Sequence, residues 1–381
     1  MKILIVHPHL SFYGGAELVV DKLATILQEN GHTCGVATLS LSKDFKNKHK
    51  EVEFHCSSGE FSDAPRSTSF FAAFGLLGEI KKLRKIIKKV ASKYDVINVH
   101  NFPTTWAASR LGKPVVWMCN EPPELWNNTN PSLLLKIATL IGGKIDQAIV
   151  NRYINRIVVA DKTNAKNLIG RYKKKPDINN YGIDYQFFSQ TKKDERLIEK
   201  YGLAKKFVVT QVGMLTPQKN QLDTLEALKK VVKKIPEIRL VLAGRGGSAY
   251  EKEVKEFIEI NDLKEYVVFT GQVDQKTIRD LYSVSNLAVF PIKTQGGWLS
   301  PFEAISSGAP VIVYPTMGAA SVISEQDLGI VSSDLGQAIL DFYNKFGSKQ
   351  VYLIRERNWI KENLTWKRFT NKFVDIFEKT K

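Results

Sequence analysis

Residues 295–314 read QGGWLSPFEAISSGAPVIVY, which is a glycine pair, a run of small helix-forming residues and a short apolar strand. Because Gly296 and Gly297 carry no side chains, a ligand can approach the backbone N–H groups, and the helix that follows adds the positive end of its dipole. Such a loop suits a diphosphate with a polyhydroxylated group beside it. The Glu303 carboxylate could then accept two hydrogen bonds from a vicinal diol such as a ribose. The competing interpretation is an ordinary loop-to-helix turn in an α/β sheet.

The same alternation of strand and helix patterns extends in both directions along the chain. Strands are expected at Lys2–Val6, Val36–Leu39, Val96–His100, Val115–Met118, Ile157–Val159, Phe207–Val212, Arg239–Ala243, Val267–Thr270, Leu287–Pro291 and Val311–Tyr314. Helices are expected at Ala16–Asn30, Gln221–Lys234, Tyr250–Ile260 and Thr277–Ser283. This alternation predicts parallel sheets with right-handed crossovers. Turn residues at 178–184, INNYGID, predict a domain boundary. We therefore expect an α/β protein with two doubly wound, Rossmann-like domains in tandem and a ligand-binding cleft between the carboxyl ends of their strands.

The composition is that of a soluble globular protein with two domains. The chain has 381 residues, of which 43% are hydrophobic and 25% charged, and this length exceeds one ordinary core. Cys34, Cys56 and Cys119 are too few and too scattered for a disulfide framework and suit a reducing compartment, so we expect a cytoplasmic protein. The opening run MKILIVHPHL is too short for a signal peptide or a membrane span and is interpreted as a first strand.

The net charge of +16 leans toward the N-terminal half of the chain. Residues 79–93, EIKKLRKIIKKVASK, combine seven basic residues with apolar residues at helical spacing. Such a basic amphipathic helix either lies on an anionic membrane or covers the sheet with its lysines in water. The aromatic and apolar run just before it favours the first option, so peripheral contact with the inner membrane face is expected through residues 70–93. Nucleic acid is not expected, because aromatic residues are not interleaved with the lysines on a strand face.

Three further loops carry candidate anion-binding groups. Gly14 and Gly15 stand directly before a predicted helix, where a phosphate or an acceptor sugar can approach its N-terminus, although a tight turn would also explain them. Gly213 ends a predicted strand, and Lys219 follows it near the start of a helix, where its ammonium group suits a leaving diphosphate. Arg245 in the sequence GRGG could share that anion if the two strands are neighbours. A solvated lysine and a solvent-facing turn are the competing interpretations.

Two places in the sequence bear on acid–base and metal chemistry. Asn120, Glu121 and Glu124 follow a predicted strand and face the expected cleft, where the carboxylates suit general acid–base work, or where they and the prolines between them only cap the turn. His7 and His9 form a His-x-His pair, and His100 ends another predicted strand. No further residue stands at a spacing that would complete a metal site with them. The chain also contains no Asp-x-Asp pair. We therefore expect neither a bound metal nor another cofactor.

Taken together, these stretches resemble the retaining glycosyltransferases of family 4, which have the GT-B fold. The resemblance runs through HPHLSFYGGAE at 7–17, INNYGIDYQFF at 178–188, VGMLTPQKNQ at 212–221, RLVLAGRGG at 239–247, VVFTGQV at 267–273, SPFEAISSGAPVIV at 300–313 and WIKENLTW at 359–366. The segment VVWMCNEPPELW at 115–126 is similar to a subgroup that includes lipid-linked-oligosaccharide and O-antigen mannosyltransferases.

The resemblance implies an acceptor-binding domain at 1–187 and a nucleotide-sugar-binding domain at 188–381. The last helix, at about 360–381, is then expected to pack back on the first domain. The implied activity is that of a hexosyltransferase in polysaccharide biosynthesis. It would move a sugar from a nucleotide-diphosphate donor to a glycan or lipid-linked acceptor, with retention and without a metal. Mannose is a mild preference among donor sugars. The alternatives are a catalytically weakened sugar-nucleotide-binding scaffold or another GT-B enzyme, such as a glycogen-synthase-like polymerase or an epimerase.

The resemblance also assigns roles to individual residues. Glu303 would bind the nucleotide ribose. The donor sugar would be bound by Gln295 and by the amides of Gly297, Trp298 and Leu299. The diphosphate would be bound by Lys219 and by the amides of Ser300 and Gly15. The donor-binding set also includes Gly14, Gly213, Arg245 and Val273, and the catalytic set is Lys219, Asn120 and Gln295.

Three positions depart from the family pattern. Gln295 stands where the family has a glutamate, Met214 where it has an arginine, and Asn120 where it has a histidine. A glutamine can still bond hydroxyl groups through its amide oxygen and nitrogen, but it cannot stabilise a positive charge as a carboxylate does. Met214 removes one of two cations beside the diphosphate, and we hypothesise that Arg245 compensates. Asn120 cannot shuttle protons, so its expected role is to orient the sugar.

Overall fold

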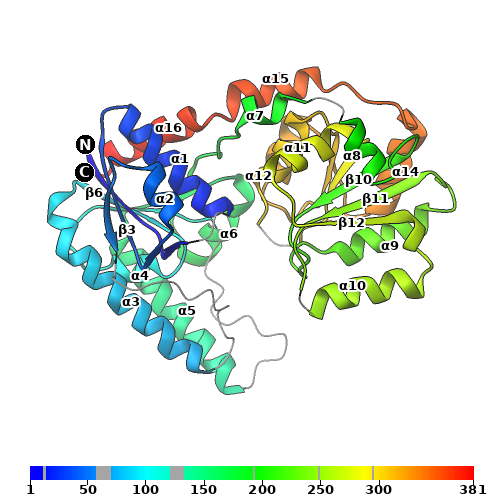
Figure 1. Ribbon diagram of the computed structural model, residues 1–381. Helices are drawn as coiled ribbons and strands as arrows, with labels where there is room; N and C mark the ends of the chain where they lie inside the picture. The colour runs from blue at the N-terminus through cyan, green and yellow to red at the C-terminus, as the bar shows by residue number, and fades with distance from the viewer. Residues whose placement is uncertain (12–13, 57–69, 121–132, 192–193, 248, 294–295) are drawn as a thin grey trace. The chain divides into compact units, whose positions relative to one another are not determined.

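The computed structural model describes residues 1–11, 14–56, 70–120, 133–191, 194–247, 249–293 and 296–381 (Figure 1). The chain forms two compact units. The first contains Met1–Tyr181 together with Trp366–Lys381, and the second contains Gly182–Thr365. Gln295, Glu121 and Glu124 lie outside the described residues.

The first unit is built on a parallel sheet with the strand order β5-β3-β1-β6-β7-β8-β9. Its strands are β1 (Lys2–Val6), β3 (Thr33–Thr38), β5 (Glu53–Cys56), β6 (Val96–His100), β7 (Val115–Met118), β8 (Arg156–Val159) and β9 (Asp177–Ile178), and a separate pair is formed by β2 (His9–Leu10) and β4 (Ser40–Leu41). The helices are α1 (Gly15–Glu29), α2 (Lys43–Lys48), α3 (Phe70–Val90), α4 (Thr104–Ala107), α5 (Leu133–Tyr153), α6 (Lys162–Tyr172) and α16 (Trp366–Glu378), with a short 3-10 helix at Ala91–Lys93.

Helix α3 contains the basic amphipathic segment that the sequence predicts. Its apolar residues Ile80, Leu83, Ile87 and Val90 are buried, and the last three belong to the same hydrophobic cluster as the sheet. The structure therefore favours the interpretation in which this stripe covers the sheet. The lysines of α3 remain exposed, and the membrane contact expected at residues 70–93 remains a prediction.

The second unit is built on a parallel sheet with the order β12-β11-β10-β13-β14-β15. Its strands are β10 (Phe207–Val212), β11 (Ile238–Ala243), β12 (Val267–Gly271), β13 (Leu287–Phe290), β14 (Val311–Val313) and β15 (Ile330–Val331). Its helices are α7 (Tyr185–Ser189), α8 (Glu195–Lys200), α9 (Gln221–Val231), α10 (Ala249–Ile260), α11 (Gln275–Val284), α12 (Leu299–Ser306), α13 (Ala320–Glu325), α14 (Leu335–Phe346) and α15 (Ile354–Asn363), with a short 3-10 helix at Lys264–Tyr266.

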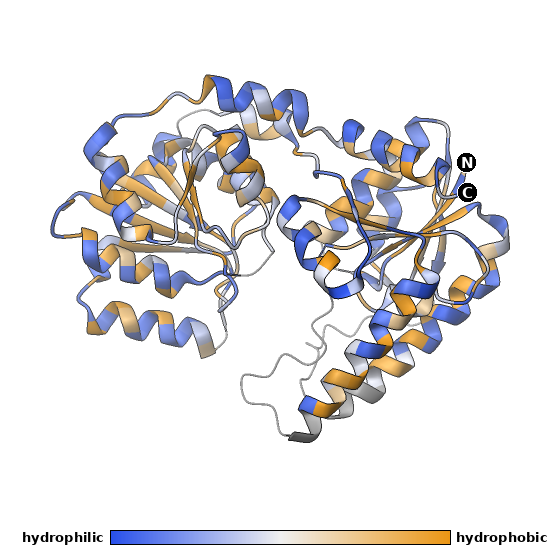
Figure 2. Ribbon diagram, turned by 180° about the vertical axis from the view of Figure 1, so that it is seen from behind, coloured by the Kyte–Doolittle hydropathy of each residue, from blue (hydrophilic) through white to orange (hydrophobic). Residues whose placement is uncertain are grey.

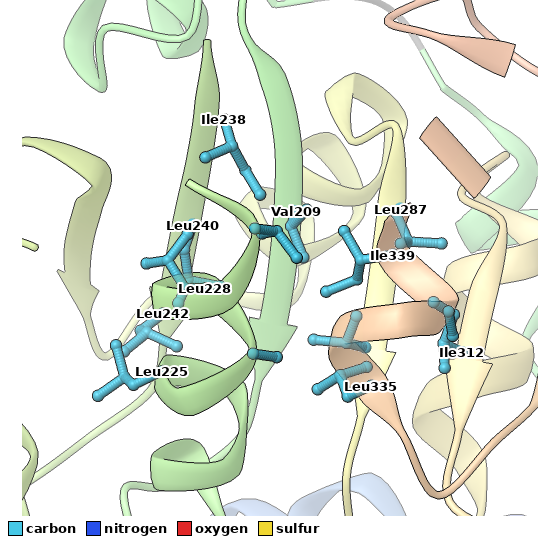
Figure 3. Close-up of a cluster of buried hydrophobic side chains, with 14 of the residues drawn as sticks. Val209, Leu225, Leu228, Ile238, Leu240, Leu242, Leu287, Ile312, Leu335 and Ile339 are labelled. Atoms are coloured by element: carbon cyan, nitrogen blue, oxygen red, sulfur yellow. The ribbon is translucent and has the colours of Figure 1, made fainter. Parts of the chain in front are cut away.

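The core of the second unit lies between this sheet and the helices α9 and α14. Figure 3 shows side chains of β10, β11, β13 and β14 meeting those of the two helices. The strands are almost continuously apolar because both faces of a parallel sheet are covered by helices. In each unit the hydropathy colouring follows this layering, with apolar residues along the strands and polar residues on outward helix faces (Figure 2). This rigid layer fixes where each strand ends, and therefore where the loops that carry the candidate site begin.

The division between the units differs slightly from the expected one at 187/188. The backbone N–H of Ile183 donates to Leu364 at 2.8 Å, and α7 packs on α12, so residues 182–187 belong to the second unit. The terminal helix α16 belongs to the first unit and packs on α1. There Asn179 donates to the Phe369 carbonyl at 3.0 Å.

Candidate functional site

Both sheets contain a point at which the direction of the crossovers reverses. In the second unit, β10 pairs with β11 on one side and with β13 on the other. In the first unit, β1 likewise pairs with β3 and with β6. The loops that follow the two strands at such a point run to opposite faces of the sheet, which leaves a crevice at their carboxyl ends. The loops after β10 and β13 are therefore the natural place for a ligand in the second unit.

The loop after β10 contacts the loop after β11, as expected for neighbouring strands. Gly213 donates its N–H to Ala243 at 2.9 Å, and Leu215 donates to the Arg245 carbonyl at 2.9 Å. Gly244 must lack a side chain, because a Cβ there would lie 2.0 Å from the Gly213 oxygen. The backbone of Arg245 thus lies beside the Lys219 loop, while its side chain is exposed to solvent.

Three polar side chains hold the Lys219 loop in place. The Gln211 amide on β10 donates to the Lys219 carbonyl at 2.7 Å, and its oxygen accepts from Thr224 of α9 at 2.7 Å. Asn220 has a φ of 59°, a left-handed conformation that asparagine tolerates better than most residues. Its amide donates to the Pro291 carbonyl at 2.9 Å. The loops after β10 and β13 are therefore tied together just beside Lys219.

Lys219 and Gly297 meet at this junction. Gly297 has a φ of 82°, and a Cβ built on it would lie 3.0 Å from Lys219 Nζ and 2.5 Å from Ile292 Cδ1. A side chain at this position would therefore clash with Ile292 and crowd the ammonium group. The next residue, Trp298, is buried and packs its ring on Phe302 with the centroids 4.5 Å apart. The packing of Trp298 on Phe302 thus fixes the first turn of α12, while Gly297 leaves space for the lysine.

Glu303 lies one turn further along α12, where its charge and that of Lys219 interact. Burial and, to a lesser extent, the nearby Asp184 carboxylate raise the pKa of Glu303, the Lys219 ammonium opposes both, and the resulting pKa is about 7. Tyr282 of α11 is fully buried, and burial together with Glu303 raises its pKa well above the ordinary value. Glu303 is therefore a carboxyl group poised between its neutral and charged forms near neutral pH.

The crevice of the first unit contains a chain of hydrogen bonds with one direction. The Tyr181 hydroxyl donates to Asn120 Oδ1. Asn120 Nδ2 donates to Asn101 Oδ1 at 2.7 Å, and Asn101 Nδ2 donates to His7 Nε2 at 3.2 Å. His7 Nδ1 then donates to the His9 carbonyl at 2.8 Å. The tautomer of His7 is assigned from these partners. The chain of hydrogen bonds joins the segments that follow β1, β6 and β7 to Tyr181, where the first stretch of the unit ends.

Burial holds His7 and His100 at this edge in their neutral form. Burial lowers the pKa of His7 to about 4 and that of His100 to about 3. His100 Nε2 contacts Asn98 Oδ1 at 2.7 Å. Glu17 Oε1 lies 4.0 Å from His7 Nε2, and Glu17 Oε2 accepts the N–H of Gly14 at 3.1 Å. Across the described parts of the chain, no three His, Cys, Asp or Glu side chains gather closely enough to hold a metal ion. The expectation of a metal-free site remains a prediction.

The structure brings together only part of the predicted set. Lys219, Gly297 and Glu303 converge with the first turn of α12, which contains Leu299 and Ser300, while Gly213 and Arg245 lie in the adjoining loops. Val273 is partly buried and packs against a hydrophobic cluster. Gly14, Gly15 and Asn120 belong to the first unit. The roles of all these residues remain predictions.

Sequence reasoning missed the residues that support the candidates: Gln211, Asn220, Asp184, Asn101 and Tyr181. A weak signal existed for two of them. Asn220 directly precedes a predicted helix, and Tyr181 stands in the turn-rich boundary segment. The others are recognisable only from contacts between segments that are distant in sequence.

Two family models match the chain, one over most of each unit. Residues 13–186 match the model described as Glycosyltransferase Family 4, and residues 193–339 match Glycosyl transferases group 1. The GDP-mannose-dependent alpha-(1-6)-phosphatidylinositol monomannoside mannosyltransferase of Mycolicibacterium smegmatis is 22% identical over 45% of this chain and 48% of its own length. The poly(glycerol-phosphate) alpha-glucosyltransferase of Bacillus subtilis is 29% identical over 45% of this chain and 27% of its own length. The matched part thus spans about half or less of each of these two relatives.

Solved structures with the same fold match the whole chain. Anabaena HepE, determined in complex with UDP and glucose, is 17% identical, with a TM-score of 0.75 and 100% of both chains covered. WaaG, a glycosyltransferase involved in lipopolysaccharide biosynthesis, is 15% identical, with a TM-score of 0.74 and 98% and 99% of the two chains covered. The fold is therefore GT-B. Since each unit matches its own model and the two models together span most of the chain, the protein belongs to the family 4 glycosyltransferases.

Proposed function

We propose that this protein transfers a hexose from a nucleoside-diphosphate sugar to a glycan or lipid-linked acceptor, with retention at the anomeric carbon and without a metal ion. The observation that carries the proposal is the convergence of Lys219, Gly297 and Glu303 at the crevice of the second sheet. The printed activities of the two relatives, one GDP-mannose-dependent and one an alpha-glucosyltransferase, support a sugar-nucleotide donor. So does the presence of UDP in the HepE structure.

The diphosphate would be bound where Lys219 meets the start of α12. The backbone N–H groups of Gly297 to Ser300 stand at the positive end of the helix dipole, and the lysine adds a full positive charge. The reaction breaks the bond between the anomeric carbon and the diphosphate oxygen, so negative charge develops on that oxygen. Fixed positive groups stabilise this charge best when they are already in position before the bond breaks. The Gln211 and Asn220 hydrogen bonds supply that preorganisation.

Glu303 would act in its charged form as the acceptor for two ribose hydroxyl groups. Because its pKa is raised to about 7, a fraction of the unliganded protein molecules have a neutral Glu303 near pH 7. A ribose that donates two hydrogen bonds favours the charged carboxylate, so donor binding releases a proton from the neutral fraction. This coupling makes donor affinity dependent on pH.

Retention would follow from attack on the face that the leaving group vacates. The acceptor oxygen bonds to the anomeric carbon while its proton passes to the departing diphosphate oxygen, so no separate protein base is needed. We propose that Asn120 orients a sugar hydroxyl. Its oxygen and one N–H are already used by Tyr181 and Asn101, which leaves one N–H of fixed direction for the substrate.

Donor hydrolysis without acceptor tests the proposal and separates an enzyme from a binding scaffold. We expect slow hydrolysis of at least one sugar among UDP-, GDP-, ADP- and dTDP-linked donors, unchanged by a chelator. Lys219→Ala should reduce this rate about 100-fold, because a charged stabiliser of a leaving group contributes about 3 kcal/mol. Binding of a donor with no turnover, even when glycan and lipid-linked acceptors are added, would instead indicate the scaffold. Loss of turnover with the chelator would reject the metal-free mechanism.

A further inference from the structure

Helix α5 exposes an apolar stripe to solvent. Leu140 is 70% exposed and Ile141 56% exposed, and Ile137 and Ile145 lie on the same helix face at spacings of three and four residues. Lys144 joins Leu140, Ile141 and Ile145 in lining a shallow groove along this face. Single exposed apolar side chains are ordinary, but a continuous stripe along one helix indicates an interaction surface.

The orientation of α5 is fixed by its opposite face. Asp146 is fully buried and accepts hydrogen bonds from Trp106 Nε1 at 2.8 Å, from Arg171 at 3.0 Å and from the Tyr172 hydroxyl. A buried carboxylate with three donors resists rotation of its helix, because losing them would leave an uncompensated charge. The hydrogen bonds of Asp146 therefore keep the apolar stripe of α5 on the solvent-exposed side of the helix.

Helix α3, which packs on the same short helix as α5, is strongly basic. Arg84 of α3 donates to the Ala107 carbonyl of α4 at 3.3 Å, and Trp106 of α4 bonds to Asp146 of α5, so α3 and α5 both pack on α4. In Figures 1 and 2 the two helices extend away from the sheet on this side of the first unit. Exposed lysines follow α3 at positions 81, 82, 85, 88 and 89.

Acidic residues are almost absent from these two helical segments. Residues 70–93 and 133–153 together contain ten Lys and Arg residues but only two acidic residues, Glu79 and Asp146. Asp146 is buried among its donors, and Glu79 lies 3.6 Å from His9. The exposed charge of this surface is therefore positive.

We propose that the exposed face of α5, flanked by the lysines of α3, docks on an anionic lipid surface. Apolar side chains on an interfacial helix enter the boundary between headgroups and acyl chains, and neighbouring lysines attract anionic headgroups. A second copy of this chain is a poorer occupant, because it would bring two positive surfaces together. The inference differs from the sequence prediction at residues 70–93, because the apolar contribution comes from α5. Within the described segments no helix is long and apolar enough to cross a bilayer, and peripheral contact does not require one.

Sedimentation of the full chain with vesicles tests the docking directly. We expect binding to vesicles of phosphatidylcholine mixed with phosphatidylglycerol, and little binding to phosphatidylcholine alone. Binding should weaken as salt is added, because the Debye length falls from about 10 Å at about 0.1 M salt to about 3 Å at about 1 M. Equal binding to both kinds of vesicle, or no binding to either, would overturn the proposal.

Matched variants locate the contact. Leu140→Ser with Ile141→Ser should lower vesicle affinity by roughly 10- to 100-fold, because two inserted apolar side chains are lost. The control is Ile260→Ser with Ile354→Ser in the second unit, whose side chains are 79% and 71% exposed, and it should bind like the wild type. Equal loss in both variants would refute a specific role for α5.

Charge and self-association are tested in the same way. Lys81→Gln with Lys85→Gln should weaken binding about fivefold per lysine, whereas Lys252→Gln with Lys255→Gln on α10 removes the same charge and should have little effect. Light scattering without lipid should give the same molecular mass for the wild type and the Leu140→Ser, Ile141→Ser variant. A dimer that this variant abolishes would show that α5 binds a second copy instead. These readouts do not involve turnover, so they stand or fall independently of the proposed activity.

Discussion

Gly297 shows how a single hydrogen atom in place of a side chain can shape a charged site. Its left-handed φ of 82° already favours glycine, and the space where a Cβ would stand is shared by Lys219 Nζ and Ile292 Cδ1. The absence of a side chain at this residue therefore leaves room for the lysine beside the first turn of α12. Backbone strain and loss of the ammonium position are separable effects, because the chain contains other glycines with positive φ.

Gly297→Ala should impair donor use far more than Gly308→Ala. Both residues have positive φ, so each substitution should cost about 1–3 kcal/mol of unfolding free energy, which thermal unfolding would measure. Nothing lies within 4 Å of a Cβ at Gly308, whereas a Cβ at Gly297 meets the side chains of both Ile292 and Lys219. We expect donor affinity to fall at least about tenfold in Gly297→Ala and to stay unchanged in Gly308→Ala, as measured by calorimetry. Equal donor affinity in the two variants would show that the position of Lys219 does not affect donor binding.

Donor affinity should fall as the pH drops below about 7. Glu303 has a raised pKa of about 7, so its carboxylate is present above that pH and is lost below it. If the carboxylate binds the ribose, affinity should decrease up to about tenfold per pH unit below the pKa. Titration of the donor at several pH values checks this expectation. Glu303→Gln should bind more weakly at high pH and lose the slope, and a wild-type slope in that variant would assign the dependence to another group.

At the scale of residues, the sequence predicted the charged groups of the site better than the residues that hold them in place. Lys219 and Glu303 stand in recognisable local patterns, and the structure brings them together. The pKa of Glu303 was not predictable, since it depends on burial and on Asp184, which is distant in sequence. The same holds for Gln211, whose partners Lys219 and Thr224 are set by the path of the loop.

At the scale of elements, the ends of β1, β6 and β7 are joined by side chains rather than by backbone. The directed chain from Tyr181 to His7 fixes the orientation of two asparagine amides, which otherwise could flip. Each amide is thus presented to the crevice with one defined face. These hydrogen bonds also order the loops, because they link segments that follow different strands.

Tyr181→Phe tests whether this chain positions Asn120. Removing the hydroxyl leaves Asn120 Oδ1 without its donor and allows the amide to flip, so we expect kcat for transfer to fall about tenfold. The donor dissociation constant should stay unchanged, because Lys219 and Glu303, the proposed diphosphate and ribose partners, lie in the second unit. A purely structural role would lower the melting temperature without changing kcat at temperatures where the protein is folded. A loss of donor affinity equal to the loss of kcat would contradict the positioning role.

The buried central strands were predictable, whereas peripheral elements were not. Val96–His100, Val115–Met118 and Phe207–Val212 match their expected bounds, because continuous apolar runs between polar turns are typical of parallel strands. The two-residue strands β2, β4, β9 and β15 depend on their partners and give no signal of their own. Helix α5 was not predicted, because Gly142 and Gly143 and an exposed apolar stripe obscure the usual pattern of a surface helix.

At the scale of the whole molecule, the chain forms two compact units and passes from one to the other twice, after Tyr181 and after Thr365. The terminal helix α16 belongs to the first unit and packs on α1, so residues from both ends of the chain pack against each other there. The second unit is continuous in sequence. Alternation of strands and helices predicted two domains, but the boundary at Tyr181 depends on the contact between Ile183 and Leu364, which no local pattern indicates.

The first unit should lose stability as the pH falls from about 7 to about 5. The pKa values of His7 and His100 are lowered in the folded state, so their stabilising contribution is complete above the ordinary value of about 6.5 and is lost as the pH falls toward the folded values of about 4 and about 3. Each histidine should cost about 2 kcal/mol over this interval. Glu17 opposes the change, because burial raises its pKa. Thermal unfolding at several pH values should show a smaller slope for His100→Gln, and an unchanged slope would rule out this assignment.

Isothermal titration calorimetry of sugar nucleotides in the presence of a chelator tests the central claim most directly. The wild type should bind at least one of the UDP-, GDP-, ADP- and dTDP-sugars with the same affinity with or without the chelator. Lys219→Ala should bind that ligand about 10- to 100-fold more weakly, because a charged hydrogen bond contributes about 1.5–3 kcal/mol, whereas Lys252→Ala should bind it like the wild type. Failure of every sugar nucleotide to bind, wild-type affinity in Lys219→Ala, or loss of binding with the chelator would contradict the account.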